Sequence, residues 1–404
     1  MPAPSEASPI SGSFSVFLDL LRIYAALCVF VCHAEFGWFG DLSIPGFLEG
    51  HDAVVVFFVL SGFVIAYSQN QNRREFTDFV IARLTRLYVT LLPALFLTVA
   101  CTMAVAYLNP SLSESLFKSF ESLRYVVCLL FLQELWFRNL TPGFNGPLWS
   151  LSYELFYYIL FAAATLIRVR WLRSVSVLLI AVIAGPNILL LLPAWLIGVA
   201  VLRLESRRPR NVVAQWMLLL VGMVVGAVLV HGGLGFPHRE GRPPLNYSSA
   251  FVTDWILAAS VGMILFAMRG LLRTGASPIV MRVARRLGDL TFPVYIFHFP
   301  LLAFFAALSG AESFNRGPIN LLGIGCAFVA SVALGLISER FRPRLASMIK
   351  LRFAWLRRTI RPRNRPELAA PIQMVVRECN NKDVLPVIEL PPLSPVVRSA
   401  SHQS

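Results

Sequence analysis

The chain has 404 residues, of which 56% are hydrophobic and 14% are charged, and its mean hydropathy is +0.66. This composition excludes an ordinary soluble domain and indicates a protein that crosses a membrane several times as α-helices. The net charge of +14 would favour nucleic-acid binding in a soluble protein, but the arginines here lie in short loops and a C-terminal tail. Because that placement is typical of membrane orientation, we expect no nucleic-acid partner.

Apolar segments long enough to cross a bilayer recur along the chain. We predict an all-α polytopic integral membrane protein with about ten transmembrane helices, at residues 14–34, 52–69, 87–107, 147–167, 174–186, 187–203, 212–231, 250–268, 290–309 and 317–338. Gly185 and Pro186 divide one apolar run into the fifth and sixth spans. Because these two pieces are short, we expect them to be tilted or partly buried in protein.

Basic residues are distributed unevenly between the two sets of loops. The loops after the even-numbered spans hold sixteen arginines, whereas the opposite loops hold six basic residues. This positive-inside bias predicts that both termini are cytoplasmic. Residues 122–137 are apolar as well, but if they crossed the membrane, the downstream basic loops would lie outside. We therefore interpret them as a re-entrant or interfacial segment.

The predicted spans divide the chain into three parts. Residues 1–13 are a short cytoplasmic N-terminus, and residues 14–338 are the transmembrane domain. Residues 339–404 are first basic and then proline-rich and polar, a composition that is typical of a disordered cytoplasmic tail.

The first span carries ionisable residues that crossing a membrane does not require. Arg22 and His33 are eleven positions apart, so on a helix they share one face and lie about 16 Å apart along its axis. Ionisable residues within a span usually face the helix bundle and are candidates for a functional site. Asp19, three residues before Arg22, is predicted to pair with it. The alternative is an arginine that extends to the lipid headgroups and a histidine at the membrane rim.

The segment DFVIARLTRLYVTLLP places Arg83 and Arg86 three residues apart on one helical face, at the predicted cytoplasmic surface. Two guanidinium groups so placed can bind phosphates. Simple anchoring of the loop by positive charge is the alternative.

The segment NGPLWSLSYELFYY begins the fourth span, with Asn145 as its predicted cap and Pro147 in its first turn. Ser150 and Glu154 are then neighbours, four residues apart, in the outer third of the helix. A buried carboxylate there suits proton transfer or the orientation of a histidine. The alternative is a glutamate whose hydrogen bonds are satisfied by tyrosine or serine hydroxyls.

The ninth span contains TFPVYIFHFP, in which Tyr295 and His298 share one face between two prolines. A histidine in this setting is either catalytic or an interhelical hydrogen-bonding group.

Together these residues resemble the acyltransferase 3 family of integral membrane O-acyltransferases, of the type that acetylates bacterial surface polysaccharides. The resemblance covers most of residues 14–338 and rests on five elements in the family's order: Arg22 with His33, FFVLSGFVI at Phe57 to Ile65, Arg83 and Arg86 with Tyr88 and Pro93, GPLWSLSYE at Gly146 to Glu154, and VYIFHFP at Val294 to Pro300. It implies transfer of an acyl group, most often acetyl, from cytoplasmic acyl-CoA to a hydroxyl of an extracytoplasmic or lipid-linked glycan. The implied location is the bacterial inner membrane.

On this resemblance, His33 is the expected general base for the acceptor hydroxyl, and Glu154 is expected to orient it. The donor acyl-CoA is a substrate whose phosphates meet three arginines, Arg22, Arg83 and Arg86. Five further residues are expected to shape or support the acceptor pocket: Asp19, Trp149, Ser150, Tyr295 and His298.

We expect no metal and no tightly bound cofactor. Acetyl and larger acyl groups such as succinyl, and direct and covalent transfer, are all compatible with these residues. The alternative function is a transporter or flippase for a sugar or lipid, because charges within spans also mark substrate paths.

Overall fold

The computed structural model describes residues 10–35, 48–116, 121–230, 243–311 and 320–360. The chain divides into two units, Met1–Arg358 and Thr359–Ser404. The first unit contains the helix bundle, and of the second only the last residues of one helix are described. The predicted tail from residue 361 onward and the first nine residues of the predicted N-terminus lie outside the described residues.

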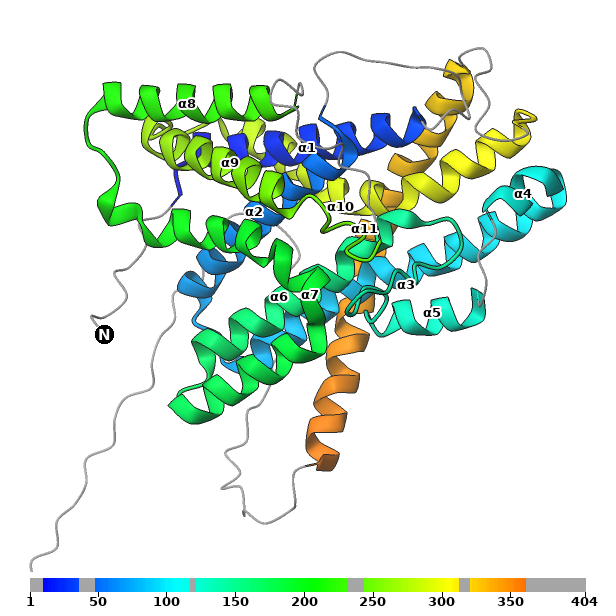
Figure 1. Ribbon diagram of the computed structural model, residues 1–404, viewed down its shortest axis with the longest axis horizontal. Coiled ribbons are helices and arrows are strands. Elements are labelled where there is room, and N and C mark those ends of the chain that lie inside the picture. Colours follow the sequence, from blue (N-terminus) through cyan, green and yellow to red (C-terminus); the bar gives the residue numbers. More distant parts are fainter. Residues whose placement is uncertain (1–9, 36–47, 117–120, 231–242, 312–319, 361–404) are drawn as a thin grey trace, which may run out of the picture. The chain divides into compact units, whose positions relative to one another are not determined.

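The described residues form α-helices and two short 3-10 helices, and no β-strand (Figure 1). In chain order the elements are α1 (Gly12–Ala34), α2 (Gly50–Asn72), α3 (Phe76–Leu108), α4 (Pro110–Leu116), α5 (Glu121–Leu129), η1 (Gly146–Leu148), α6 (Trp149–Leu166), α7 (Arg170–Arg203), η2 (Glu205–Arg207), α8 (Val212–Val230), α9 (Phe251–Leu271), α10 (Pro278–Leu308) and α11 (Leu321–Ile360).

Within the described part of the chain, eight helices are long and apolar enough to cross a membrane: α1, α2, α3, α7, α8, α9, α10 and α11. The prediction of an all-α polytopic membrane protein is therefore confirmed. The fourth predicted span corresponds to the shorter α6, which has 18 residues, and the fifth and sixth are the two halves of α7. The count of ten spans and their orientation stay predictions.

α7 bends sharply at Gly185. The φ of this residue is 78° and its ψ is 178°, a backbone region that is essentially restricted to glycine. The bend brings α7 against Trp136, whose backbone N–H donates to the carbonyl of Ala184 at 3.1 Å. A Cβ at Gly185 would lie 2.7 Å from the Cα of Trp136. Glycine is thus required both for the bend and for this close approach.

Residues 122–137 do not form a transmembrane helix. The nine residues of α5 extend about 14 Å, roughly half the thickness of the hydrocarbon core. After α5 the chain turns into the protein, where Gln133 and Glu134 are fully buried. The side-chain amide of Gln133 donates to the carbonyl of Leu148 at 2.8 Å. The short helix and the buried polar side chains support the prediction that this segment does not cross the membrane, which stays a prediction.

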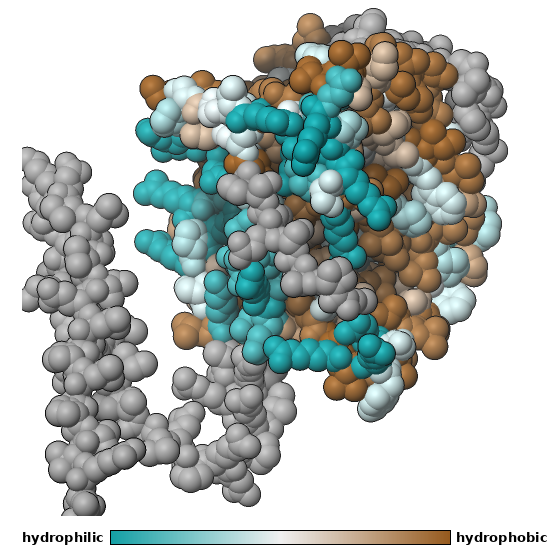
Figure 2. All heavy atoms as spheres, turned by 90° about the vertical axis from the view of Figure 1, so that its left-hand side faces the viewer, coloured by the Kyte–Doolittle hydropathy of each residue, from teal (hydrophilic) through white to brown (hydrophobic). Residues whose placement is uncertain are grey.

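Hydrophilic side chains gather on one face of the molecule, the left-hand side of Figure 1, as Figure 2 shows. α1 begins on this face beside the α9–α10 connection, where the N–H of Ser13 donates to the carbonyl of Thr274 at 3.2 Å. Nearby, Nε of Arg269 at the end of α9 lies 3.2 Å from Oε2 of Glu205 in η2. Several of the basic loops that we assign to the cytoplasm therefore meet on a common face.

The predicted orientation can be tested with single cysteines in a variant whose native cysteines are replaced. Cysteines at Asn72, Arg207 and Ala276 should be protected from a membrane-impermeant thiol reagent added to intact cells, because these positions lie in the basic loops. Cysteines at Leu108 and Ser309, at the C-terminal ends of α3 and α10, should be labelled, because these ends lie on the predicted outer side. Labelling of Arg207→Cys from outside would contradict the orientation.

Two glycines bring α2 and α7 into backbone contact. A Cβ at Gly198 would lie 1.9 Å from the carbonyl oxygen of Val59, and a Cβ at Gly62 would lie 2.0 Å from that of Trp195. The indole N–H of Trp195 donates to Ser61 at 3.2 Å across the same contact. Small residues let transmembrane helices approach this closely, so dispersion and polar contacts can hold them together in lipid.

Gly198→Ala should lower the free energy of unfolding by about 1–3 kcal/mol, the usual cost of overpacking, because the backbone of α2 cannot move out of the way. The measurement is the thermal unfolding midpoint in detergent. Gly325→Ala on α11 is the matched control, since a Cβ there meets nothing within 4 Å. Its midpoint should be unchanged or slightly raised by better helix propensity. Equal midpoints for the two variants would show that the α2–α7 contact is not tightly packed.

Candidate active site

The two histidines singled out by the sequence contact each other. Nδ1 of His33, in the last turn of α1, lies 2.8 Å from Nε2 of His298 in α10. His298 is fully buried, whereas His33 is partly exposed. The structure therefore places His298 as the interhelical hydrogen-bonding group that the sequence analysis offered as one alternative, and its partner is His33.

Hydrogen bonding defines the tautomers of this pair when both rings are neutral. Nδ1 of His298 lies 3.1 Å from the carbonyl oxygen of Val294, which can only accept, so this nitrogen carries the proton. Nε2 of His298 is then an acceptor, and Nδ1 of His33 donates to it. The basic lone pair of His33 is consequently on Nε2. In this tautomer, His33 can take a proton while His298 holds its ring in place.

Aromatic side chains surround the histidine pair. The ring of Phe299 stands perpendicular to that of His33, with the two centroids 4.9 Å apart. The rings of Phe30 and Tyr295 lie 6.0 and 6.3 Å from that of His298. These contacts restrict the rotation of both imidazoles and leave His33 as the more accessible ring.

Tyr295 connects the histidine pair to the start of α6. Its hydroxyl lies 2.9 Å from Oγ of Ser150, and both hydroxyls donate to the carbonyl of Pro147, at 3.1 and 3.2 Å. Tyr295 is three residues before His298, so the two side chains lie close together on α10. The predicted supporting residues Ser150, Tyr295 and His298 are therefore brought together.

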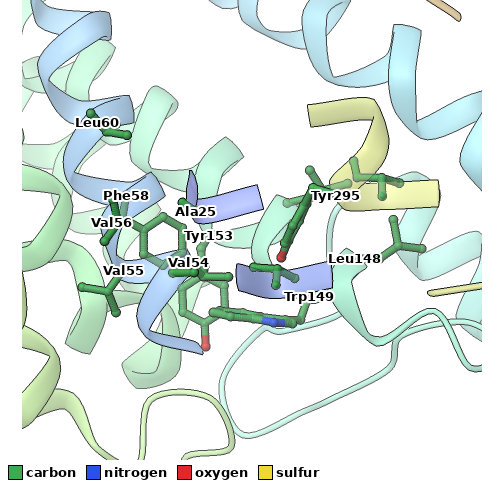
Figure 3. Close-up of a cluster of buried hydrophobic side chains, with 14 of the residues drawn as sticks. Ala25, Val54, Val55, Val56, Phe58, Leu60, Leu148, Trp149, Tyr153 and Tyr295 are labelled. Atoms are coloured by element: carbon green, nitrogen blue, oxygen red, sulfur yellow. The ribbon is translucent and has the colours of Figure 1, made fainter. Parts of the chain in front are cut away.

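Trp149, the first residue of α6, packs between other rings. Its indole stacks on Tyr247 with the centroids 4.2 Å apart and lies nearly parallel to the ring of His51 at 6.0 Å. Figure 3 shows Trp149 and Tyr295 in one cluster with Val54 and other residues of α2. Since Trp149 is only 5% exposed, its main effect is to position the start of α6.

The predicted cap of this helix is wrong in detail. Gly146–Leu148 form a 3-10 turn, so α6 begins at Trp149, and the side chain of Asn145 caps no helix. Instead its amide donates to Thr98 at 3.0 Å and to the carbonyl of Ile296 at 3.2 Å. Asn145 is fully buried and connects α3 and α10, because a buried amide must find partners wherever they lie.

A cavity opens among α1, α2, α3, α6, α10 and α11. Its polar lining comes from eleven residues: Arg22, Ser61, Arg86, Thr90, Ser150, Glu154, Tyr158, Asp289, Thr291, Glu339 and Arg342, together with the hydroxyl of Tyr295. One apolar wall is formed by α2, with Val54, Phe57, Phe58, Leu60, Val64 and Ile65. The wall of the cavity thus combines charged groups with an apolar face.

Arg22 faces this cavity as part of an ion pair. Its Nη1 lies 3.4 Å from Oδ1 of Asp19, so the predicted pair is confirmed. Asp19 packs closely on α10, where a Cβ at Gly288 would lie 3.0 Å from Oδ1. The neighbouring Asp289 also attracts Arg22. Together α1 and α10 hold a cation at the cavity wall.

Arg83 and Arg86 have different surroundings. Arg86 lines the cavity and interacts electrostatically with Glu154, Asp289 and Glu339. Arg83 is not among the lining residues, and it is only 7% exposed. Its guanidinium lies over the rings of Phe79 and Tyr158, 5.3 and 5.9 Å from their centroids, and donates to Ser68 at 3.3 Å. The two guanidiniums therefore do not both face the cavity, although their spacing places them on one side of the helix.

Glu154 also has a different setting from the expected one. Its carboxylate accepts a hydrogen bond from the hydroxyl of Tyr158, one turn further along α6, and lies in the cavity wall near Arg86. The group hydrogen-bonded to His33 is His298. His298 therefore occupies the position beside His33 that was expected for Glu154.

Several polar residues of the site were not predicted from the sequence. Asp289, Glu339 and Arg342 line the cavity, and His51 lies 3.1 Å from the buried Asp254 next to Trp149. A search for every charge near the end of a predicted span would have found the first three. Among the described residues, no group of three or more His, Cys, Asp or Glu side chains is placed to hold a metal ion.

Comparison with known proteins gives a consistent result. A family model described as an acyltransferase domain matches residues 15–340, most of the chain. The acyltransferase MdmB of Streptomyces mycarofaciens is 27% identical over 360 residues, which cover 78% of this chain and 88% of that protein. The peptidoglycan O-acetyltransferase OatA of Listeria monocytogenes is 24% identical over 326 residues, which cover 70% of this chain and 49% of OatA, about half its length. No solved structure gives a significant match.

Proposed function

Because the chain belongs to the acyltransferase 3 family of membrane acyltransferases, we propose that it moves an acetyl group from cytoplasmic acetyl-CoA to a hydroxyl of a cell-surface or lipid-linked glycan. Membership of this family makes the chain an enzyme of the O-acetyltransferase type, and the transporter alternative is dropped. The name of the peptidoglycan O-acetyltransferase relative supports a glycan acceptor. We propose the bacterial inner membrane as its location.

The observation that carries the proposal is a cavity that has cations in its wall and lies beside the histidine pair. Arg22 and Arg86 lie in its wall, and so does Tyr295, whose ring centroid lies 6.3 Å from that of His298. We assign the phosphates of the donor to the arginines, because guanidinium groups bind phosphate oxygens through paired hydrogen bonds. The apolar wall from α2 then suits the pantetheine arm, which would carry the thioester toward His33.

His33 is the proposed general base. Its Nε2 takes the proton of the acceptor hydroxyl while the hydroxyl oxygen attacks the thioester carbonyl, the carbon–sulfur bond breaks, and the CoA thiolate takes the proton from the imidazolium. His298 holds His33 in the required tautomer through Nδ1. Positioned proton transfer of this kind typically contributes about 10²–10⁴-fold to a rate.

Glu154, Arg83 and Asp19 are proposed as positioning residues. Asp19 orients Arg22, and Glu154 is a charge partner of Arg86. Arg83 acts more remotely, because its guanidinium packs on Tyr158, which in turn donates to Glu154.

The function is tested with membranes that contain the protein. They should release free CoA from acetyl-CoA when a glycan acceptor is added, and mass spectrometry of the glycan should show one acetyl group added per CoA released. Membranes that contain the His33→Gln variant at the same level are the control. Equal CoA release by wild type and variant would contradict the proposed activity of this site.

His33→Gln should lower kcat by about 10²–10⁴-fold, because glutamine keeps a hydrogen-bonding group but cannot take the proton. His298→Gln should keep partial activity, since its amide oxygen can still accept from Nδ1 of His33, whereas His298→Phe should fall toward the level of His33→Gln. The measurement is glycan acetylation per unit of membrane-inserted protein. Substantial turnover by His33→Gln would move the base to another residue.

Arg86→Gln should raise the KM for acetyl-CoA about tenfold with little change in kcat, because a charge-assisted hydrogen bond made in the ground state is lost. Arg83→Gln should change this KM much less and mainly lower the thermal unfolding midpoint, since its contacts are with Phe79, Tyr158 and Ser68. KM values that rise equally in both variants would contradict the separation of the two arginines.

A further inference from the structure

α11 extends the donor cavity beyond the last predicted span. Its 40 residues measure about 60 Å, twice the thickness of the hydrocarbon core, so a large part of the helix projects past the membrane. Glu339 and Arg342 follow the end of the predicted span at residue 338, and both line the cavity that contains Arg22 and Arg86. The match to the family model ends at residue 340, so Arg342 lies outside it.

The charges at this end of the cavity are arranged as competing pairs. Nη1 of Arg342 lies 2.8 Å from Oε2 of Glu339, and their side chains are 39% and 23% exposed. Glu339 also attracts Arg86. Arg22 and Arg86 are close enough to repel each other, and Asp289 attracts both. Three guanidiniums therefore share one cavity with carboxylates. An anionic ligand that binds these guanidiniums must displace the carboxylates from them.

We propose, on the basis of the function proposed above, that Arg342 is a third phosphate-binding residue for the nucleotide end of acyl-CoA and that Glu339 competes with the phosphate for it. Acyl-CoA carries a pyrophosphate and a separate phosphate on its ribose, so three guanidiniums match its phosphates better than two. Arg342 is the most suitable for the outermost phosphate, because it is near the solvent and beyond the span. The Glu339 carboxylate holds this guanidinium toward the cavity and gives way when the phosphate binds.

The two residues are therefore expected to have opposite effects on the donor. Arg342→Gln should raise the KM for acetyl-CoA about tenfold, which corresponds to the smallest loss of binding free energy that is typical when a hydrogen bond to a charged group is removed. Glu339→Gln should lower this KM about twofold to fivefold, which corresponds to the interaction free energy of a partly exposed ion pair. The kcat should change little in both. Arg344→Gln is the matched control, because this exposed arginine lies on the same helix but outside the cavity and packs on Phe341.

Acetyl-pantetheine, which has the thioester but no phosphate, distinguishes phosphate binding from a general effect on the fold. None of the α11 variants should change the KM for this donor. An increase for Arg342→Gln with acetyl-pantetheine as large as with acetyl-CoA would overturn the proposal, and so would an increase for Glu339→Gln with acetyl-CoA.

Arg86→Gln separates failure of this inference from failure of the proposed function. If Arg86→Gln raises the KM for acetyl-CoA and Arg342→Gln does not, only the role of Arg342 is wrong. If neither variant changes it, the cavity does not bind the donor phosphates and the roles of both arginines are wrong, whereas the proposed function itself fails only if CoA release does not depend on His33.

Discussion

Charged side chains within a membrane protein must face other polar groups, and the arrangement of helices around the site depends on this constraint. Arg22 pairs with Asp19 on its own helix, and Asp19 packs closely on α10, where a Cβ at Gly288 would lie 3.0 Å from its Oδ1. The same two helices meet again at His33 and His298. α1 and α10 therefore meet closely at two places along their length, and the arginines of the cavity lie near the first of them.

α10 joins the two parts of the site. Tyr295 lines the cavity and shares a hydrogen bond with Ser150, while His298, one turn further, holds His33. A single helix thus sets the distance between the donor cavity and the proposed base. The carbonyl of Pro147 in η1 keeps this spacing, since it accepts hydrogen bonds from Ser150 of α6 and Tyr295 of α10. In the proposed function, this arrangement favours transfer along a defined path from the arginines toward His33.

Much of the site could be predicted from single residues, but little of its pairing could. Arg22, Glu154 and His33 were identifiable because each is an ionisable group in an apolar span, and the Asp19–Arg22 pair follows from a separation of one helical turn. The partner of His33 lies 265 residues away, so no local rule could find it. Arg83 and Arg86 lie three residues apart, yet one packs on rings and the other lines the cavity, because neighbouring helices differ at the two positions.

The sequence by itself determined that the chain is a helical membrane protein and where most of its helices lie. It also determined which residues resemble those of the acyltransferases. Hydropathy, the uneven distribution of loop arginines and short motifs are local properties, so they can be seen without the fold. The sequence also predicted that residues 122–137 do not cross the membrane, since the distribution of basic residues between the loops is a property of the sequence. Only the tertiary structure decided that His298 rather than Glu154 holds His33, that Arg83 is buried, and that Glu339 and Arg342 belong to the cavity. These outcomes depend on which side chains distant helices bring together, and helix packing selects them through contacts that sequence spacing does not encode.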